Sequence, residues 1–277
     1  MLNFTYTWQS SNNEKIWGQG WQPEGDVDAV LCIVHGHGEH CSRYAPMAEY
    51  FGHHRIATLS YDAVGHGQSG GKRGYIDSFD TYRADAQRLV TKAREMYPGV
   101  PVFLFGHSMG GLVVATYILK DKPTNITGVI LSAPMFSLSF EVPGWKLIAS
   151  RIMYKIYPYI TLPSDLDPRS ISRDPAEVVK YENDPLVHGM ANPVIGVEGL
   201  DDGIWAVENA GSFSLPLLIY HGTGDKITSC KSSEEFASKV KSDITWKAYE
   251  GYYHELHNDN GREEVLEMIL NWLQTRY

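Results

Sequence analysis

Gly106-His107-Ser108-Met109-Gly110 directly follows the apolar run 102–105. The apolar run predicts a buried strand, and the apolar residues 111–119 predict a helix after the pentapeptide. A serine hydroxyl becomes nucleophilic only where a base can take its proton, so it must stand clear of the backbone. The two glycines relieve the crowding of a sharp strand-to-helix turn that presents a serine in this way. We therefore expect Ser108 to be a nucleophile at the end of a strand.

The composition of the chain bounds its class. The chain has 277 residues, of which 43% are hydrophobic and 21% are charged, so it can form one large α/β domain with an inserted segment. The formal net charge of −9 disfavours nucleic acid or an anionic membrane surface as an electrostatic partner. Neutral or cationic small-molecule substrates are expected instead.

Several absences from the sequence indicate the compartment. The N-terminus lacks the pattern of a signal peptide, and no apolar run is long enough to span a membrane. Cys32, Cys41 and Cys230 are widely spaced and show no metal-binding pattern, which favours reduced thiols. We expect a cytoplasmic protein without a cofactor or a metal. A transient, peripheral contact with membranes or lipid surfaces is left open.

Short β-rich runs alternate with helical patterns along most of the chain. This alternation predicts parallel strands joined by right-handed crossovers, with helices on both faces of the sheet. A leading hairpin over 5–8 and 17–21 is expected to extend one edge. The expected strands are Ala29–Val34, Ile56–Tyr61, Val102–Phe105, Val129–Ser132, Leu217–Tyr220 and Thr245–Tyr249, and the expected helices are Tyr44–Gly52, Thr81–Met96, Met109–Lys120, Ser232–Lys241 and Arg262–Gln274.

The alternation breaks between Pro134 and about Ser214. This segment is rich in proline and shows no clear strand, while apolar residues between Trp145 and Tyr159 recur near helical spacing. We interpret 134–214 as an inserted cap and 1–133 with 215–277 as the core. Since the insertion leaves after one strand and returns before the next, we expect it over the carboxyl ends of the strands, where open α/β sheets bind ligands.

The acid that would orient a catalytic base is expected on a loop after a later strand. Asp225 meets this condition, because it follows the predicted strand 217–220. Asp201 and Asp202 are alternatives, but they fall inside the predicted cap.

The base is expected on the loop after the next strand. His254 comes first after the glycine turn that ends strand 245–249, whereas His257 lies nearer the final helix and remains an alternative. In this arrangement Asp225 would orient the imidazole, and His254 would take the proton of Ser108.

Two backbone amides are expected to form an oxyanion hole. One is the amide of Met109, at the start of the helix after the serine. The other is the amide of His37, in the glycine-rich run His35-Gly36-His37-Gly38-Glu39-His40.

The same run allows a second interpretation. It nearly matches the H-x-H-x-D-H run with which metallo-β-lactamase-like hydrolases bind two zinc ions. This alternative puts Glu39 where aspartate is usual and leaves the ordered Ser108, Asp225 and His254 without a purpose.

Seven motifs together resemble the monoacylglycerol lipase and lysophospholipase family of the α/β-hydrolase superfamily. They extend over nearly the whole chain, and their combination is far more specific than any one of them. The motifs are 35–40 with Arg43-Tyr44, Asp62-Ala63-Val64-Gly65-His66-Gly67-Gln68-Ser69, 106–111, Leu131-Ser132-Ala133-Pro134, Asn183-Asp184-Pro185-Leu186, His221-Gly222-Thr223-Gly224-Asp225 and 253–257.

The resemblance implies an eight-stranded sheet with one antiparallel strand and a helical cap with an apolar surface. It implies a serine hydrolase that cleaves monoacylglycerols to glycerol and fatty acid through an acyl-enzyme. The glycerol end of the substrate would lie near Glu39, Arg43 and His257, although Glu39 and Arg43 can also simply brace the loop as an ion pair. His37 stands where the family usually has a small or aliphatic residue, and an imidazole there would narrow or polarise the acyl mouth.

Other activities remain open within and outside this family. A lysophospholipase or a short-chain carboxylesterase would use the same serine chemistry. A non-catalytic receptor with the α/β-hydrolase fold is a further alternative, because a fold alone does not prove a function.

Overall fold

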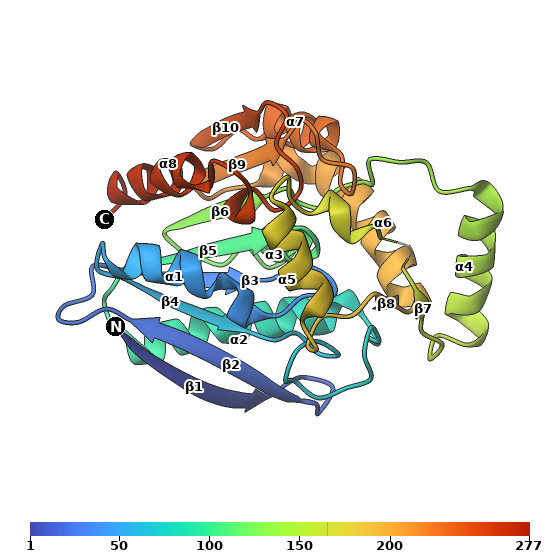
Figure 1. Ribbon diagram of the computed structural model, residues 1–277, viewed down its shortest axis with the longest axis horizontal. Helices are drawn as coiled ribbons and strands as arrows, with labels where there is room; N and C mark the ends of the chain where they lie inside the picture. Colours follow the sequence, from blue (N-terminus) through green and yellow to red (C-terminus); the bar gives the residue numbers. More distant parts are fainter. Residues whose placement is uncertain (165) are drawn as a thin grey trace.

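The computed structural model describes residues 1–164 and 166–277. Its central feature is an eight-stranded sheet with the order β1-β2-β4-β3-β5-β6-β9-β10 (Figure 1). The strands are β1 Leu2–Gln9, β2 Lys15–Gln22, β3 Ala29–Val34, β4 Ile56–Tyr61, β5 Val102–His107, β6 Gly128–Ser132, β9 Leu217–Gly222 and β10 Ile244–Tyr249.

One strand of this sheet runs against the others. β2 pairs antiparallel with both β1 and β4, whereas all pairs from β4 to β10 are parallel. The mostly parallel sheet with a single antiparallel strand confirms the expected α/β-hydrolase fold. The leading hairpin is also present, in a register that pairs Leu2 with Gln22 and Gln9 with Lys15.

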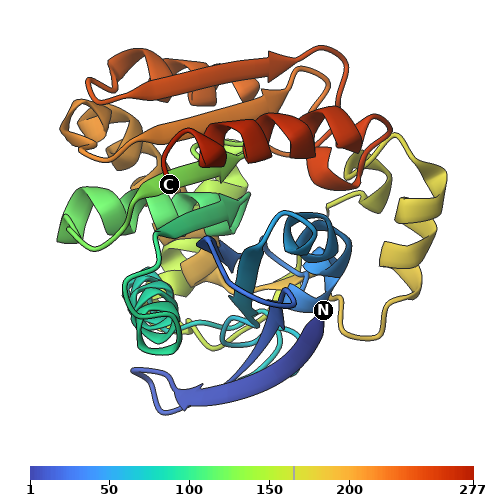
Figure 2. The same ribbon diagram turned by 90° about the vertical axis from the view of Figure 1, so that its left-hand side faces the viewer.

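Helices cover both faces of the sheet. α1 (Ala45–Gly52) and α8 (Arg262–Gln274) lie side by side on one face (Figure 2). The other face carries α2 (Phe79–Met96), α3 (Met109–Asp121) and α7 (Cys230–Lys239).

The alternating side chains of β3 show why the central strands read as continuous apolar runs. All six residues of β3 are buried. Ala29, Leu31 and Ile33 pack into the core under α1 and α8, while Val30 and Cys32 pack into the core under α2 and α3. A strand covered on both faces needs apolar residues at every position.

The segment between β6 and β9 departs from the sequence-based expectations. Its helices are α4 (Gly144–Ile156), α5 (Pro175–Asn183) and α6 (Pro193–Asn209), and only the first was expected. α5 and α6 each begin with a proline. Proline suits this position, because it lacks the backbone N–H that the first helical turn leaves unpaired. The residues before these prolines, Asp174 and Asn192, cap the helices with their side chains.

This segment also contains a two-stranded sheet, so the prediction of no strand there is wrong. β7 (Leu162–Pro163) pairs antiparallel with β8 (Met190–Ala191). Strands of two residues carry no alternating pattern that a sequence could reveal. α4 stands apart from the main sheet in Figure 1 and packs mainly against α6.

α7 also lies two residues earlier than expected. Its N-cap is Ser229, whose side chain accepts a hydrogen bond from the Ser232 amide, and the chain becomes extended at Val240. Short 3-10 helices complete the connections at η1 Cys41–Tyr44, η2 Pro168–Ser170, η3 Ala210–Ser212 and η4 Leu256–Asn258. Within 1–164 and 166–277, no helix is both long and apolar enough to cross a membrane.

Candidate active site

Ser108 occupies a strained turn between β5 and α3. Its backbone has φ 54° and ψ −119°, which is unusual for any residue other than glycine. A Cβ on Gly106 would meet the carbonyl oxygen of Gly110, and a Cβ on Gly110 would meet the carbonyl oxygens of Val34 and His35. Both glycines are therefore required by close backbone approach, as the sequence predicts.

The topology brings the predicted residues to one edge of the sheet. β3 lies directly beside β5, so the loop that carries His37 lies next to Ser108. Asp225 follows β9, and His254 follows the neighbouring strand β10. The carboxyl ends of parallel strands meet at the same edge, which is where such folds bind ligands.

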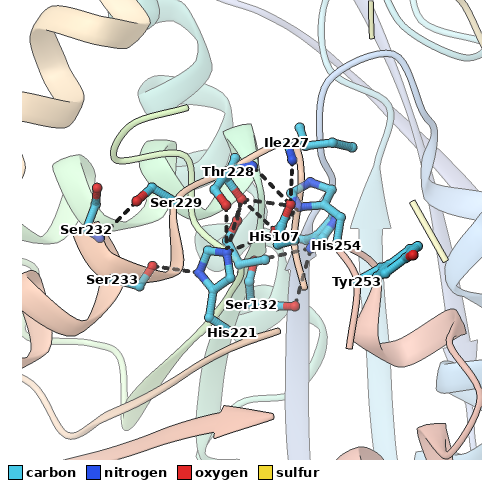
Figure 3. Close-up of polar contacts among 12 residues, drawn as sticks. His107, Ser132, His221, Ile227, Thr228, Ser229, Ser232, Ser233, Tyr253 and His254 are labelled. Carbon is cyan, nitrogen blue, oxygen red and sulfur yellow. Dashed lines mark hydrogen bonds and ion pairs between the residues drawn. The ribbon is translucent and has the colours of Figure 1, made fainter. Parts of the chain in front are cut away.

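Asp225 and His254 form a buried pair, and Figure 3 shows His254 beside Thr228. His254 Nδ1 lies 2.7 Å from Asp225 Oδ2. The other carboxylate oxygen, Oδ1, accepts hydrogen bonds from the amides of Ile227 at 2.7 Å and Thr228 at 3.0 Å. Because Nδ1 of His254 is engaged by the carboxylate, Nε2 is the nitrogen that remains for a serine proton.

The electrostatics of the pair suit a base. Burial alone would raise the pKa of the Asp225 carboxyl, but His254 and His221 outweigh burial and hold this pKa far below its ordinary value. Burial alone would lower the pKa of His254, but the Asp225 carboxylate outweighs burial and raises it above 6.5. Each pKa thus favours the charged form of its group when the partner is present.

Both predicted oxyanion donors are backbone amides without a hydrogen-bond partner in the described chain. The His37 amide makes no hydrogen bond to any other part of the described chain, and the Met109 amide belongs to the unpaired first turn of α3. Because α3 has its N-terminus here, its dipole also favours negative charge beside Ser108. The arrangement can stabilise an oxyanion.

The side chain of His37 packs among other imidazoles. Its ring lies 5.4 Å from that of His66 and 5.7 Å from that of His188, measured between centroids. Burial, followed by the neighbouring His188 and His35, lowers the pKa of His37 to about 3. His37 is therefore neutral at physiological pH, and it contributes to the wall of the cavity described below.

The predicted zinc alternative is wrong for the described residues, among which no group of metal-ligating side chains could hold an ion. His35 bonds to the carbonyl of Gly36 and the amide of Ala63. His40 pairs with Asp184 at 2.9 Å. The side chains of the H-x-H-x-E-H run thus point to different partners.

The alternative acids and the alternative base lie elsewhere. Asp202 pairs with Arg83 and Lys120, and Asp201 pairs with Arg151. The His257 ring stacks on Tyr44 with 5.0 Å between centroids, and neither of its nitrogens has a hydrogen-bond partner within the described chain. Of these candidates, only Asp225 and His254 contact one another.

Arg43 is held between two carboxylates. Its guanidinium donates to Glu39 Oε2 at 2.8 Å and to both oxygens of Glu255 at 2.7 Å. Glu39 Oε1 also accepts hydrogen bonds from the Gly36 amide at 2.7 Å and from the Tyr44 hydroxyl at 2.9 Å. The bracing role that the sequence allows for Glu39 and Arg43 is therefore observed.

Arg43, rather than burial, decides the charge of Glu255. Burial alone would raise the pKa of Glu255, but Arg43 outweighs it and lowers that pKa well below its ordinary value. Glu255 is a residue that the sequence analysis missed, although it directly follows His254. Only the fold brings it to Arg43, which lies 212 residues earlier.

A cavity of about 820 Å³ connects these groups. Ser108, His254, Glu39 and Glu255 line its polar end, whereas Arg43 and His257 are not part of its described wall. Its volume is typical of a small-molecule site. The rest of the wall is mainly apolar and comes largely from α4 and α6, including Trp145, Leu147, Met153, Ile195, Val197 and Leu200.

Comparisons with known proteins agree with this geometry. A family model described as serine aminopeptidase, S33, matches residues 25–261. The chain is 32% identical over 273 residues to a monoglyceride lipase of Rattus norvegicus, covering 96% of this chain and 89% of that protein. It is 34% identical over 269 residues to an uncharacterised abhydrolase domain-containing protein of Dictyostelium discoideum, of which it spans 28%.

Among solved structures, a monoacylglycerol lipase of Paleococcus ferrophilus superimposes with a TM-score of 0.84. The two chains are 30% identical, and each is covered completely.

Proposed function

The chain belongs to the serine aminopeptidase S33 family of α/β-hydrolases, and on that premise we propose that it hydrolyses the ester bond of monoacylglycerols to glycerol and a fatty acid. The observation that carries the proposal is a cavity that Ser108 and His254 share with an apolar wall. An ester with one long acyl chain and a small polar end matches that division. The named relatives are consistent with this substrate.

The proposed reaction has two halves. Ser108 Oγ attacks the ester carbonyl carbon while His254 takes its proton, and the amides of His37 and Met109 stabilise the oxyanion. The tetrahedral intermediate collapses, the alkoxide of glycerol leaves with the proton from His254, and the acyl group stays on Ser108. Water then attacks the acyl-enzyme, His254 takes a proton from that water, and the fatty acid is released with Ser108 restored. Asp225 stabilises the imidazolium in both halves.

The glycerol end is assigned to Glu39, Arg43 and His257. Glu39 supports this assignment because it lines the cavity. Arg43 would act from behind by fixing Glu39 and Glu255, since its donors are engaged by both carboxylates. His257 stacks on Tyr44 outside the described cavity wall, so it too would support the polar end from behind.

Residues 134–214 would form a cap over a core of 1–133 and 215–277. Support comes from the contributions of α4 and α6 to the cavity wall. α4 also presents an apolar stripe to solvent, made of Trp145, Ile148, Ile152 and Ile156, whose exposures range from 50% to 74%. Such a stripe on an amphipathic helix would favour transient contact with a lipid surface.

A chain-length series tests the proposed substrate. We would measure kcat/KM for monoacylglycerols from acetyl to oleoyl, and for lysophosphatidylcholines of the same lengths, with the wild type and with Ser108→Ala. The expected result is a rise toward longer monoacylglycerols and a loss of roughly 10⁴-fold or more in Ser108→Ala. A maximum at acetyl or butyryl would favour a short-chain carboxylesterase, and a preference for the choline lipids would favour a lysophospholipase.

Chelation provides an independent check of the serine chemistry. The expected result is unchanged turnover after dialysis against EDTA, because no step of the proposed reaction uses a metal ion. Turnover that is lost with EDTA and restored by zinc would contradict the proposal, as would undiminished turnover in Ser108→Ala.

A further inference from the structure

The carboxylate of Asp225 binds a second imidazole besides that of His254. His221, near the end of β9, has its Nε2 2.9 Å from Asp225 Oδ2, the same oxygen that His254 Nδ1 approaches to 2.7 Å. The hydroxyl of Thr228 lies 3.0 Å from that oxygen. His221 lies near the end of β9 and His254 lies on the loop after β10, and Figure 3 shows Thr228 close to both rings.

The surroundings of His221 fix the position of its proton. Nε2 faces Asp225 Oδ2 and, at 3.2 Å, the carbonyl oxygen of Thr228. Both of these atoms only accept hydrogen bonds, so Nε2 must carry a proton. Nδ1 lies 2.8 Å from the hydroxyl of Ser233 on α7, which can donate to it. His221 is thus oriented as a donor to the carboxylate.

This chain of contacts is completely enclosed. The side chains of His221 and Asp225 are 0% exposed, and Ser233 is also 0% exposed. Water therefore does not compete for these hydrogen bonds, and a donor removed here is not replaced by solvent. The position is sensitive to the loss of a single N–H group.

We propose that His221 is a positioning residue for the general base: its Nε2–H fixes Asp225 Oδ2 against His254 and withdraws negative charge from that oxygen. The inference rests on the proposed function, because it assigns His254 as the base for Ser108. His221 does not touch the substrate and acts only through Asp225. Ser233 contributes by orienting the His221 ring.

The consequence appears in the pH dependence. A carboxylate oxygen that accepts more hydrogen bonds carries less negative charge, so it stabilises the imidazolium of His254 less. Removing the His221 donor therefore raises the pKa of His254, and the ascending limb of kcat/KM moves to higher pH. Loss of the fixed geometry lowers kcat at the same time, while KM for a small soluble ester stays nearly unchanged.

Other titratable groups also face this pair, and they stay constant when His221 alone is changed. The His107 ring on β5 lies 4.7 Å from that of His254. Glu39, Glu255, Arg43 and His257 also act electrostatically on His254 or His107, and the Asp225 carboxylate acts on Cys230.

The test compares three variants on p-nitrophenyl butyrate, whose hydrolysis needs the triad but no lipid preference. His221→Met fills the space without a donor, and His221→Gln retains an N–H near the position of Nε2. Tyr220→Phe is the matched control, because Tyr220 is buried on the neighbouring position of β9 and packs into the core under α1 and α8. We would measure kcat, KM and the pH profile of kcat/KM for each.

The expected result is a fall in kcat of about tenfold in His221→Met, a twofold or smaller change in KM, and an ascending limb shifted upward by roughly half a pH unit or more. His221→Gln restores kcat to within about threefold and returns the limb to its wild-type position. Tyr220→Phe leaves both unchanged. An unshifted limb in His221→Met, or a His221→Gln variant as impaired as His221→Met, would overturn the proposal.

A second variant covers the case in which His221→Met does not fold. Ser233→Ala removes the hydroxyl that orients the His221 ring, and alanine has nearly the same volume as serine. This variant should shift the ascending limb in the same direction as His221→Met, by a smaller amount. A wild-type profile in Ser233→Ala would then count against the proposal. Failure of the proposed function itself is distinguishable, because Ser108→Ala with an intact His221 would then still turn over the ester.

Discussion

α3 and α4 are both thirteen-residue helices, yet their environments are opposite. Eleven residues of α3 are buried, and no residue of α4 is buried. α3 packs against β5, α2 and α6, while α4 rests mainly on α6. α3 begins at Met109, directly after Ser108, whereas α4 forms part of the apolar cavity wall.

This difference separates two tasks within one site. The proposed nucleophile needs a fixed position, and dense packing around α3 supplies it. The acyl chain of a lipid varies in length, and a lightly packed helix can adapt to it at a lower cost in free energy. Substitutions in α3 should therefore affect chemistry and stability, whereas substitutions in α4 should affect lipid contact.

The largest expected effect distinguishes glycines in the two helices. In Gly110→Ala, the new Cβ would collide with the carbonyl oxygens of Val34 and His35 and displace the loop that carries the proposed oxyanion donor His37. We expect kcat on a soluble ester to fall by roughly 10²–10³-fold, the loss typical of one oxyanion donor. Gly144→Ala, at the start of α4, has no atom within 4 Å of its new Cβ and should keep wild-type kcat. Equal kcat values in Gly110→Ala and Gly144→Ala would contradict the expected difference between the two helices.

A second pair compares stability at identical residue types. Ile118 in α3 is 1% exposed, and Ile152 in α4 is 50% exposed. Ile118→Ala should lower the free energy of unfolding by about 2–5 kcal/mol, because it leaves a cavity in the core. Ile152→Ala should change it by less than about 0.5 kcal/mol. Urea denaturation followed by circular dichroism measures both, and a large loss in Ile152→Ala would show that α4 packs more tightly than described.

A smaller effect is expected at a lipid surface. Replacing both Ile152 and Ile156 by serine removes about half of the exposed stripe on α4, and should weaken binding to neutral phosphatidylcholine vesicles by roughly tenfold. Turnover of a soluble ester should be unchanged. Val179→Ser, an equally exposed apolar residue on α5, is the control and should bind vesicles like the wild type. Vesicle binding that is identical in all three proteins would argue against a lipid contact through α4.

The smallest expected effect of changing α4 is on the pH dependence of kcat/KM. As the proposed base, His254 must be neutral to accept the serine proton, and Asp225 raises the pKa of His254 above 6.5. Activity should therefore fall as the pH is lowered through a value above 6.5, and the ascending limb of kcat/KM reports that value. The double serine variant of α4 should show the same limb as the wild type. A wild-type limb below 6.5 would show that the Asp225 carboxylate does not stabilise the imidazolium.

The same contrast explains how far the sequence predicts the fold. β3, β4 and α8 begin and end at the predicted residues, because their apolar patterns are clear and have sharp limits. α5 and α6 were missed, because the prolines that begin them resemble loop residues. In α6, glycines at 196, 199 and 203 also interrupt the apolar pattern. A buried helix such as α3 and an exposed one such as α4 both show apolar patterns. The sequence pattern therefore did not predict which of the two helices is buried.

For the site, chain order was more informative than composition. Ser108, Asp225 and His254 each follow a predicted strand, and parallel strands bring such residues to one edge. Contacts between distant residues gave no local signal. Glu255 meets Arg43 only through the fold, and the role of His221 depends on which way its ring points.

Covalent labelling tests the central claim most directly. The wild type and Ser108→Ala would be incubated with a fluorophosphonate probe, and the site of modification would be identified by peptide mass spectrometry alongside ester turnover. We expect one adduct on Ser108 that abolishes turnover, and neither labelling nor turnover in Ser108→Ala. An adduct on another residue, or ester hydrolysis that persists in Ser108→Ala, would contradict it.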